Sequence, residues 1–285
     1  MTKPIVDISK WQGNINADVM VPKVSGVIAR ASHGEWPDRL FSQNYDKLTK
    51  RTRLGAYHYW KPAVDSQSQV KMFASQLDGK SFQLPIFVDV EDTPAVNAPK
   101  TLAANLREFI ERLKLARPFD EIGIYTRASY WDYYLKSAAP WAANFKLWVA
   151  QYTGASSPIV PGPWKPDNWY LWQYSADGNG KGPEYGVQST AIDLNRMNPH
   201  HADQPDQPDP LPVPTQPLPR LRVIRPVNVR REPRLLSERL ATLGYGDIID
   251  VKQIHIATAW QCWVEHNGGW SAATYNGIKF MEGVK

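Results

Sequence analysis

The 285-residue sequence contains a single cysteine, Cys262, so it cannot form an intramolecular disulfide. The fold therefore does not depend on an oxidising compartment. No apolar run reaches the ~20 residues that a membrane-spanning helix needs, and the mean hydropathy is -0.46. Six scattered histidines and no cysteine cluster give no pattern for structural zinc. We expect a soluble protein without a membrane span, metal or cofactor.

Two further absences concern targeting and partners. The N-terminal residues MTKPIVDISKWQG lack the apolar core and small-residue cleavage site of a secretion signal. No run of five or more basic residues occurs, which argues against a nucleic-acid partner. The net charge of +5 divides into +4 over residues 1–198, -3 over 199–219 and +4 over 220–285. Charge per residue is thus most positive in the last segment, which would attract anionic polymers.

Proline dominates residues 199–219, PHHADQPDQPDPLPVPTQPLP. Such a stretch favours an extended, semi-rigid spacer over a helix or a strand ladder. We therefore predict a domain over 1–198, a linker over 199–219 and a second domain over 220–285.

The first domain shows an alternation of apolar strand-like runs and helical patterns. The predicted strands cover residues 4–9, 26–32, 55–60, 85–91, 122–126, 146–152, 170–175 and 191–195. Helical patterns lie near 14–23, 38–52, 64–78, 100–117 and 128–138. This alternation is typical of parallel strands joined by crossover helices. We predict an α/β fold, an irregular TIM-like barrel with eight strands and about five helices.

Four acidic residues occupy positions where barrel strands end. Asp89 and Glu91 share one side of the fourth strand, because side chains alternate with period two. Asp7 and Asp193 belong to the first and eighth strands, which are neighbours in a closed barrel. Paired carboxyl groups of this kind serve glycoside cleavage, in which one donates a proton and another stabilises the positive charge that develops.

Two other interpretations of these acids remain. Each acid alone could cap a helix or face solvent, and we favour that interpretation for Asp92, which is out of phase. Clustered carboxylates can also bind metal. No histidine stands at ligand spacing beside them, so a glycosidase is the stronger hypothesis.

The content of 12 Trp and 13 Tyr is also high, and aromatic faces stack on sugars. Six aromatic residues fall at or near strand ends and are our candidates for substrate contacts: Tyr57, Tyr59, Trp60, Tyr125, Tyr152 and Trp172. Structural packing is the alternative for each. His58 lies between two of them and is interpreted as a packed histidine.

The motifs of residues 4–198 resemble those of the family 25 glycoside hydrolases, lysozymes of phages and bacteria. They are DISKWQG (7–13), GAYHYW (55–60), PIFVDVED (85–92), IGIYT (122–126), LWVAQY (147–152), LWQYS (171–175) and IDLN (192–195). The resemblance implies hydrolysis of the β-1,4 bond between N-acetylmuramic acid and N-acetylglucosamine. By position it implies Glu91 as proton donor, Asp89 as the residue that orients the N-acetyl group or stabilises charge, and Asp7 and Asp193 as the rest of an acidic floor.

Residues 220–285 contain short β-type runs separated by turn signals, which predict a small all-β module. The stretches VNVRREP (227–233) and WQCWVEHNGGWSAATY (260–275) resemble bacterial SH3-like barrels attached to wall hydrolases. The resemblance implies a wall-binding role, with Trp260, Trp263, Trp270 and Tyr275 as candidate groove residues. Some of them are needed for the core of so small a module.

The sequence thus predicts a monomeric peptidoglycan hydrolase of the phage or prophage endolysin type. It would be made in the host cytoplasm and reach the wall after holin-dependent release or on the virion. Its partner would be peptidoglycan, with anionic wall polymers as further ligands of the basic second domain. The alternatives are a catalytically silent wall-binding or virion structural protein, and a chitinase-like hydrolase of N-acetylglucosamine polymers.

Overall fold

The computed structural model describes residues 3–95, 97–117, 120–202, 220–233, 237–258, 261–275 and 278–284. The chain divides into two compact units, of which the first comprises residues 1–114 and 119–207 and the second mainly residues 208–285. Every helix in the described residues is too short or too polar to span a bilayer.

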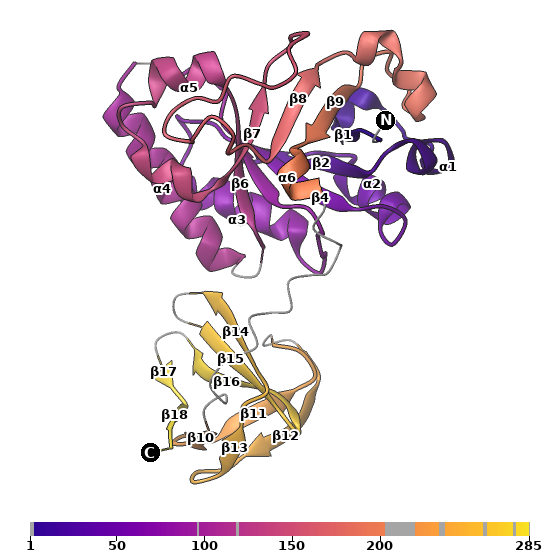
Figure 1. The fold of residues 1–285 in the computed structure, drawn as a ribbon. Coiled ribbons are helices and arrows are strands. Elements are labelled where there is room, and N and C mark those ends of the chain that lie inside the picture. The colour runs from indigo at the N-terminus through magenta and orange to yellow at the C-terminus, as the bar shows by residue number, and fades with distance from the viewer. Residues whose placement is uncertain are drawn as a thin grey trace. The chain divides into compact units, whose positions relative to one another are not determined.

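The first unit is a closed barrel (Figure 1). Over the described residues, eight strands form it: β1 (Ile5–Ile8), β2 (Gly26–His33), β4 (Leu54–Tyr59), β5 (Ile86–Asp89), β6 (Ile122–Arg127), β7 (Lys146–Ala150), β8 (Leu171–Ser175) and β9 (Asp193–Met197). The strands from β1 to β8 pair in parallel in chain order, and β9 closes the barrel between β8 and β1. The short strand β3 (Trp36–Pro37) pairs with β2 outside this ring. The prediction of an eight-stranded barrel is therefore confirmed.

The direction of the last strand differs from the prediction of an all-parallel barrel. β9 is antiparallel to both β8 and β1. A parallel strand here would need a crossover to the opposite end of the barrel, usually a helix. The connection from β8 to β9 contains only the 3-10 turns η4 (Gly178–Gly180) and η5 (Gly182–Tyr185), so the chain returns directly.

The helices cover the outside of the barrel. They are α1 (Ala17–Met20), α2 (Phe41–Leu48), α3 (Ser66–Leu77), α4 (Pro99–Ala116) and α5 (Ala128–Tyr134), with 3-10 turns η1 (Lys10–Gln12), η2 (Val21–Lys23) and η3 (Pro140–Asn144). In Figure 1, α3, α4 and α5 lie on one side of the barrel and α1 and α2 on the other. Each of the five predicted helical patterns overlaps one of these helices, and α4 begins one residue before its pattern.

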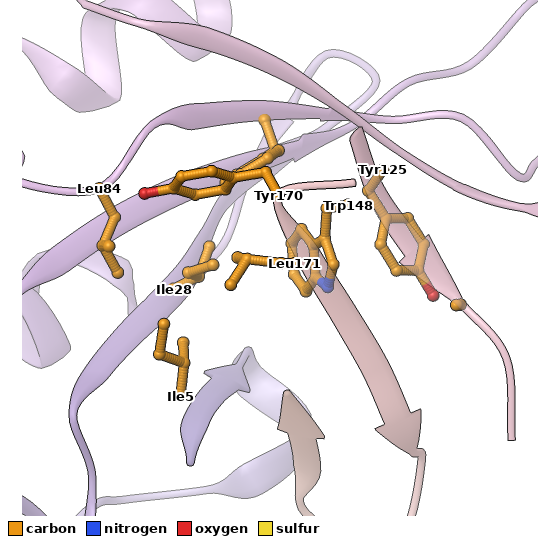
Figure 2. Close-up of a cluster of buried hydrophobic side chains, with 9 residues drawn as sticks. Ile5, Ile28, Leu84, Tyr125, Trp148, Tyr170 and Leu171 are labelled. Atoms are coloured by element: carbon orange, nitrogen blue, oxygen red, sulfur yellow. The ribbon is translucent and has the colours of Figure 1, made fainter. Parts of the chain in front are cut away.

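A mixed aromatic and aliphatic cluster fills the barrel interior. Its buried members are Ile5, Ile28, Leu84, Phe87, Tyr125, Trp148, Ala150, Tyr170 and Leu171. Figure 2 shows Trp148 between Leu171 and Tyr125, and the Tyr125 and Trp148 ring centroids are 4.6 Å apart. Gly123 on β6 leaves the space that the Phe87 ring occupies, because a Cβ there would clash with it. Large rings therefore occupy the interior below the barrel mouth.

The predicted linker begins with a short helix. Pro199–Ala202 form one turn, α6, although we expected no helix in residues 199–219. Proline is tolerated in a first helical turn, and Asn198 Oδ1 accepts a hydrogen bond from the His200 amide at 3.1 Å, which caps the turn. Residues 203–219 of the predicted linker lie outside the described residues.

The second unit contains only strands in the part that is described. One sheet has the order β13 (Ile248–Asp250), β10 (Arg220–Val223), β18 (Met281–Gly283). The other has the order β12 (Arg239–Leu243), β11 (Val227–Arg230), β16 (Gly269–Tyr275), β15 (Gln261–His266), β14 (Gln253–Thr258), and β17 (Ile278–Lys279) pairs with β16. All pairings are antiparallel. Trp263 lies in the apolar core of this unit.

A buried polar cluster connects the barrel wall to α3. His58 on β4 is sandwiched between Phe73 and Phe109, with ring centroids 5.3 and 5.1 Å away. Its Nδ1 lies 2.8 Å from Ser32 Oγ and its Nε2 lies 3.1 Å from Gln69 Oε1. Since an amide oxygen only accepts, Nε2 carries a proton. Burial lowers the pKa of His58 to about 3, so His58 is a packed residue, as the sequence suggested.

Replacing Gln69 by leucine should destabilise this unit. Gln69 Oε1 also accepts from the Lys61 amide at 2.9 Å, so Gln69→Leu leaves one buried and one partly buried donor without this acceptor. We expect the free energy of unfolding to fall by roughly 1–3 kcal/mol, measured by urea unfolding followed by tryptophan fluorescence. Gln67→Leu, an exposed position of the same helix, is the control. Equal losses in the two variants would contradict the assignment.

Candidate active site

A cavity of about 220 Å³ opens at the barrel mouth, where the parallel strands end. We call it the acidic cavity. It is lined by Asp7, Tyr57, Asp89, Glu91, Tyr125, Arg127, Trp148, Tyr152, Gln173, Ala176 and Asp193. All four acids that the sequence singled out therefore line one cavity.

Strand register brings the acids together. Asp7 lies near the end of β1, and Asp193 is directly opposite it at the start of β9. Because β9 is antiparallel, its first residue lies at the same rim as the last residues of the parallel strands. Asp89 ends β5 beside Tyr59 and Tyr125, and Glu91 follows two residues later.

Two side-chain amides hold the carboxylate of Asp7. Its Oδ2 accepts hydrogen bonds from Asn195 Nδ2 at 2.7 Å and from Gln173 Nε2 at 3.0 Å. The Gln173 Oε1 accepts from the hydroxyls of Tyr125 at 2.9 Å and Tyr152 at 2.8 Å. Gln173 thereby connects two tyrosines to an acid across the cavity.

The carboxyl groups of Asp7 and Asp193 differ in how strongly their surroundings raise their pKa values. Burial raises the pKa of Asp7, but the hydrogen bonds from Asn195 and Gln173 oppose this rise. Burial raises the pKa of Asp193 to about 9, and the neighbouring charge of Asp7 adds to the effect. The two amide donors favour the ionised form of Asp7, whereas Asp193, with a pKa of about 9, favours its protonated form.

Asp89 and Glu91 differ in their access to solvent. Asp89 is buried, and its Oδ1 has no hydrogen-bond partner among the described residues. Burial, then the charges of Glu91 and Asp7, raise the pKa of Asp89 well above the ordinary value. The Glu91 side chain is 24% exposed, and its Oε2 lies 3.6 Å from Arg127 Nε. Burial raises the pKa of Glu91, while the charge of Arg127 opposes the rise.

This arrangement supports acid–base chemistry. Glu91 is a carboxyl group whose raised pKa favours the protonated form and whose partial exposure allows contact with a ligand. Three further carboxyl groups lie around it, and at least one of them carries a negative charge that could stabilise a cation. An acid beside an anion is the combination that cleavage of a glycosidic bond needs.

Three of the predicted aromatic contacts line the acidic cavity: Tyr57, Tyr125 and Tyr152. Tyr59 lines two adjoining hollows instead, one of which also contains Glu91. Asp92, interpreted as a bystander, lies outside the cavity lining, and its Oδ1 lies 2.9 Å from Lys61 Nζ.

Trp60 and Trp172 are not available as substrate contacts. Each side chain is only 1% exposed, and neither lines the acidic cavity. Trp172 lies next to Gln173, so the period of two turns it to the opposite side of β8. There its Nε1 donates to the Gln151 carbonyl at 2.7 Å. Both residues contribute to packing.

The sequence interpretation missed three polar residues of the acidic cavity and its support, namely Arg127, Gln173 and Asn195. The two-residue alternation of side chains along each strand could have identified them. Gln173 lies two residues after the interior Leu171, and Asn195 two residues after Asp193, within motifs already recognised. Arg127 lies two residues after Tyr125, just beyond the predicted strand. A polar residue whose position in the strand alternation points it into the barrel is therefore a candidate site residue, just as an acidic residue is.

The described candidate groove residues of the second unit lie in or against its apolar core and not in an open groove. Trp263 is buried in the core, and Trp270 and Tyr275 pack partly against the same core. The ring centroids of Trp263 and Tyr275 are 6.2 Å apart. Trp260 lies outside the described residues. Trp263 therefore builds the unit and has no open face for a ligand.

In the described ranges, no group of three or more His, Cys, Asp or Glu side chains is arranged to hold a metal ion.

Comparisons with known proteins agree with this geometry. The model of the family described as "Glycosyl hydrolases family 25" matches residues 6–183. Lysozyme M1 of Streptomyces globisporus is 33% identical over 205 residues, which cover 68% of this chain and 67% of the relative.

Solved structures give the same result. The bacterial lysozyme of Streptomyces coelicolor superposes with a TM-score of 0.60 at 32% identity, over 70% of this chain and 93% of that one. The catalytic domain of endolysin ply40 from bacteriophage P40 of Listeria monocytogenes shares the fold, with a TM-score of 0.55 at 24% identity, over 70% and 95%. The chain belongs to glycosyl hydrolase family 25 and is a glycosidase.

Proposed function

We propose that this protein is a peptidoglycan muramidase that cleaves the β-1,4 bond between N-acetylmuramic acid and N-acetylglucosamine. The observation that carries the proposal is Glu91, a partly exposed carboxyl group with a raised pKa beside the buried Asp89 and Asp7 and the partly buried Asp193. The similarity to lysozymes from two Streptomyces species supports bacterial wall glycan as the substrate.

In this proposal Glu91 donates its proton to the leaving glycosidic oxygen and then acts as the base toward water. The unpartnered Oδ1 of Asp89 is placed to hold the substrate N-acetyl group or to stabilise the charged intermediate. The negative charge on Asp7 contributes further stabilisation, and Asp193 keeps that charge in place by holding a proton.

The second unit is proposed to be an SH3-like module that anchors the enzyme to the wall. Support comes from its all-antiparallel sheets and its local net charge of +4 over residues 220–285. An anchor raises the effective concentration of the barrel at its polymer. We also propose a phage or prophage origin, with action on the wall after release, because an endolysin catalytic domain shares the barrel fold.

Glu91→Gln should abolish most of the activity, because an amide cannot donate the proton. We expect a loss of roughly 10²–10⁴-fold in rate, measured on purified peptidoglycan with mass analysis of the products. Glu111→Gln, an exposed position of α4, is the matched control and should retain activity. New reducing ends on N-acetylmuramic acid are expected. Ends on N-acetylglucosamine would indicate a chitinase-like hydrolase, and unchanged walls would indicate a silent binding protein.

Removing the charge of Arg127 should extend activity to higher pH. Activity requires protonated Glu91 and therefore falls as pH rises through its pKa, which Arg127 lowers. Arg127→Gln should move this alkaline limb upward, whereas Arg127→Lys keeps the charge and should leave it near its original position. The measurement is the pH profile of kcat/KM on a soluble glycan. A downward shift in the Gln variant would refute Glu91 as the acid.

A fragment comprising residues 1–207 should retain bond cleavage but bind whole walls less tightly than the full chain, because it lacks the proposed anchor. Sedimentation with intact walls measures binding, and release of reducing ends from soluble glycan measures cleavage. Equal wall binding by the fragment and the full chain would remove the anchoring role.

A further inference from the structure

A second hollow lies at the ends of β1, β2 and β4, next to the acidic cavity. We call it the basic pocket. It has a volume of about 210 Å³ and is lined by Lys10, Trp11, Arg30, His33, Tyr59 and Lys61. None of these lining residues is acidic, which contrasts with the four carboxyl groups of the acidic cavity.

Arg30 is the fixed element of the basic pocket. Its side chain is only 9% exposed, and its Nε donates to Asp38 Oδ2 at 2.9 Å. Asp38 is held in turn by the amide of Lys10 at 2.9 Å. The Arg30 Nη2 is buried and has no hydrogen-bond partner among the described residues. A buried guanidinium donor without a partner costs free energy, which a bound acceptor would recover.

Two lysines extend the positive charge toward the surface. Lys61 Nζ lies 2.9 Å from Asp92 Oδ1 and 4.8 Å from the Tyr59 ring centroid, and Lys10 Nζ lies 4.9 Å from the Trp11 ring centroid. Asp38 and Asp92 neutralise part of this charge from outside the lining. Three cations face these two acids, so one positive charge remains in excess. In agreement, burial and the charges of Arg30, Lys10 and Lys61 lower the pKa of His33 against the opposing charge of Asp38.

The basic pocket also presents surfaces for a sugar. Trp11 is 71% exposed, so its ring is open to a ligand. Tyr59 lines both this pocket and a hollow of about 550 Å³ that contains Glu91 and Arg127. A glycan chain with its cleaved bond at Glu91 would therefore pass Tyr59 and bring a neighbouring substituent to Arg30.

We propose that Lys10, Arg30 and Lys61 form an anion subsite that binds a carboxylate or phosphate group carried on the glycan chain. The subsite gives the enzyme a preference for anionic over neutral glycan strands. Muramic acid can present such a group as its lactyl carboxylate or as a phosphate on the sugar. The proposal deepens the proposed function and rests on it for the identity of the polymer.

Binding of three matched oligosaccharides tests the subsite. They are a muramic-acid oligomer with free lactyl carboxylates, its neutral methyl ester, and the methyl ester with a phosphate on the muramic C6 hydroxyl. Titration calorimetry uses the full chain carrying Glu91→Gln, so that ligands persist. At least one anionic form should bind about tenfold more tightly than the neutral ester, as expected for a charge-assisted hydrogen bond. Which form does so identifies the source of the anion.

In the same background, Lys10→Gln with Lys61→Gln should bring the ratio of anionic to neutral affinity close to one. Lys71→Gln with Lys165→Gln removes the same net charge at exposed positions outside the pocket and should preserve the ratio. Lys10→Gln alone, which leaves the ion pair between Lys61 and Asp92 in place, should lower the ratio partially. Equal affinity for all three ligands would overturn the proposal, as would an equal fall of the ratio in the control.

The proposed function can fail separately from the subsite. A lysine-dependent preference together with intact walls after digestion by the native protein would retain the subsite and reject the muramidase. Cleavage to N-acetylmuramic acid ends without any preference would do the reverse.

Discussion

The buried carboxylate of Asp7 is the interaction on which the arrangement of the barrel mouth depends. A buried charge is tolerated only when hydrogen bonds replace its hydration. Asn195 and Gln173 provide them from β9 and β8. The two amides are themselves oriented, because Trp148 Nε1 donates to Asn195 Oδ1 at 2.7 Å and the tyrosine hydroxyls donate to Gln173 Oε1. Each amide therefore has only its NH₂ group left to point at Asp7.

This orientation decides how the acids divide their protons. With a negative charge favoured at Asp7, a second charge at the partly buried Asp193 would lie directly beside it. The raised pKa of Asp193, about 9, follows from that asymmetry. Asp89 has no comparable donors and is also shifted upward in pKa. Glu91 lies 3.6 Å from Arg127 in a partly exposed position. Burial raises its pKa although the charge of Arg127 opposes the rise, so its protonated form is favoured at a position that a ligand can reach.

Most of this arrangement could be predicted from local sequence, and the parts that could not have definite causes. The strands and the four acids carry periodic patterns that a single chain displays. β9 is antiparallel because the connection before it contains no crossover helix. A prediction based on alternating strands and helices assumes such a helix and therefore gives the wrong direction for this strand. Trp60 and Trp172 were predicted as ligand contacts from their residue type. Their positions in the strand alternation, which turn the side chains away from the barrel interior, were not taken into account. Gln173 and Asn195 act only through partners that are distant in sequence, such as Tyr125 and Asp7, so their roles emerge once the barrel closes.

The same electrostatics make the acidic cavity compatible with an anionic polymer. Four ionised acids at the mouth would repel a wall glycan that carries carboxylates or phosphates. A proton held at Asp193, whose pKa is about 9, reduces that charge, and burial and mutual repulsion shift the pKa of Asp89 in the same direction. The remaining negative charge is centred on Asp7, and its effect in water falls off over a Debye length of about 8–10 Å. Cations at the adjoining basic pocket then offset it where the substituents of a bound strand would lie. An acidic centre can thus act on a substrate of its own charge sign when its protons are retained and its neighbouring surface is basic.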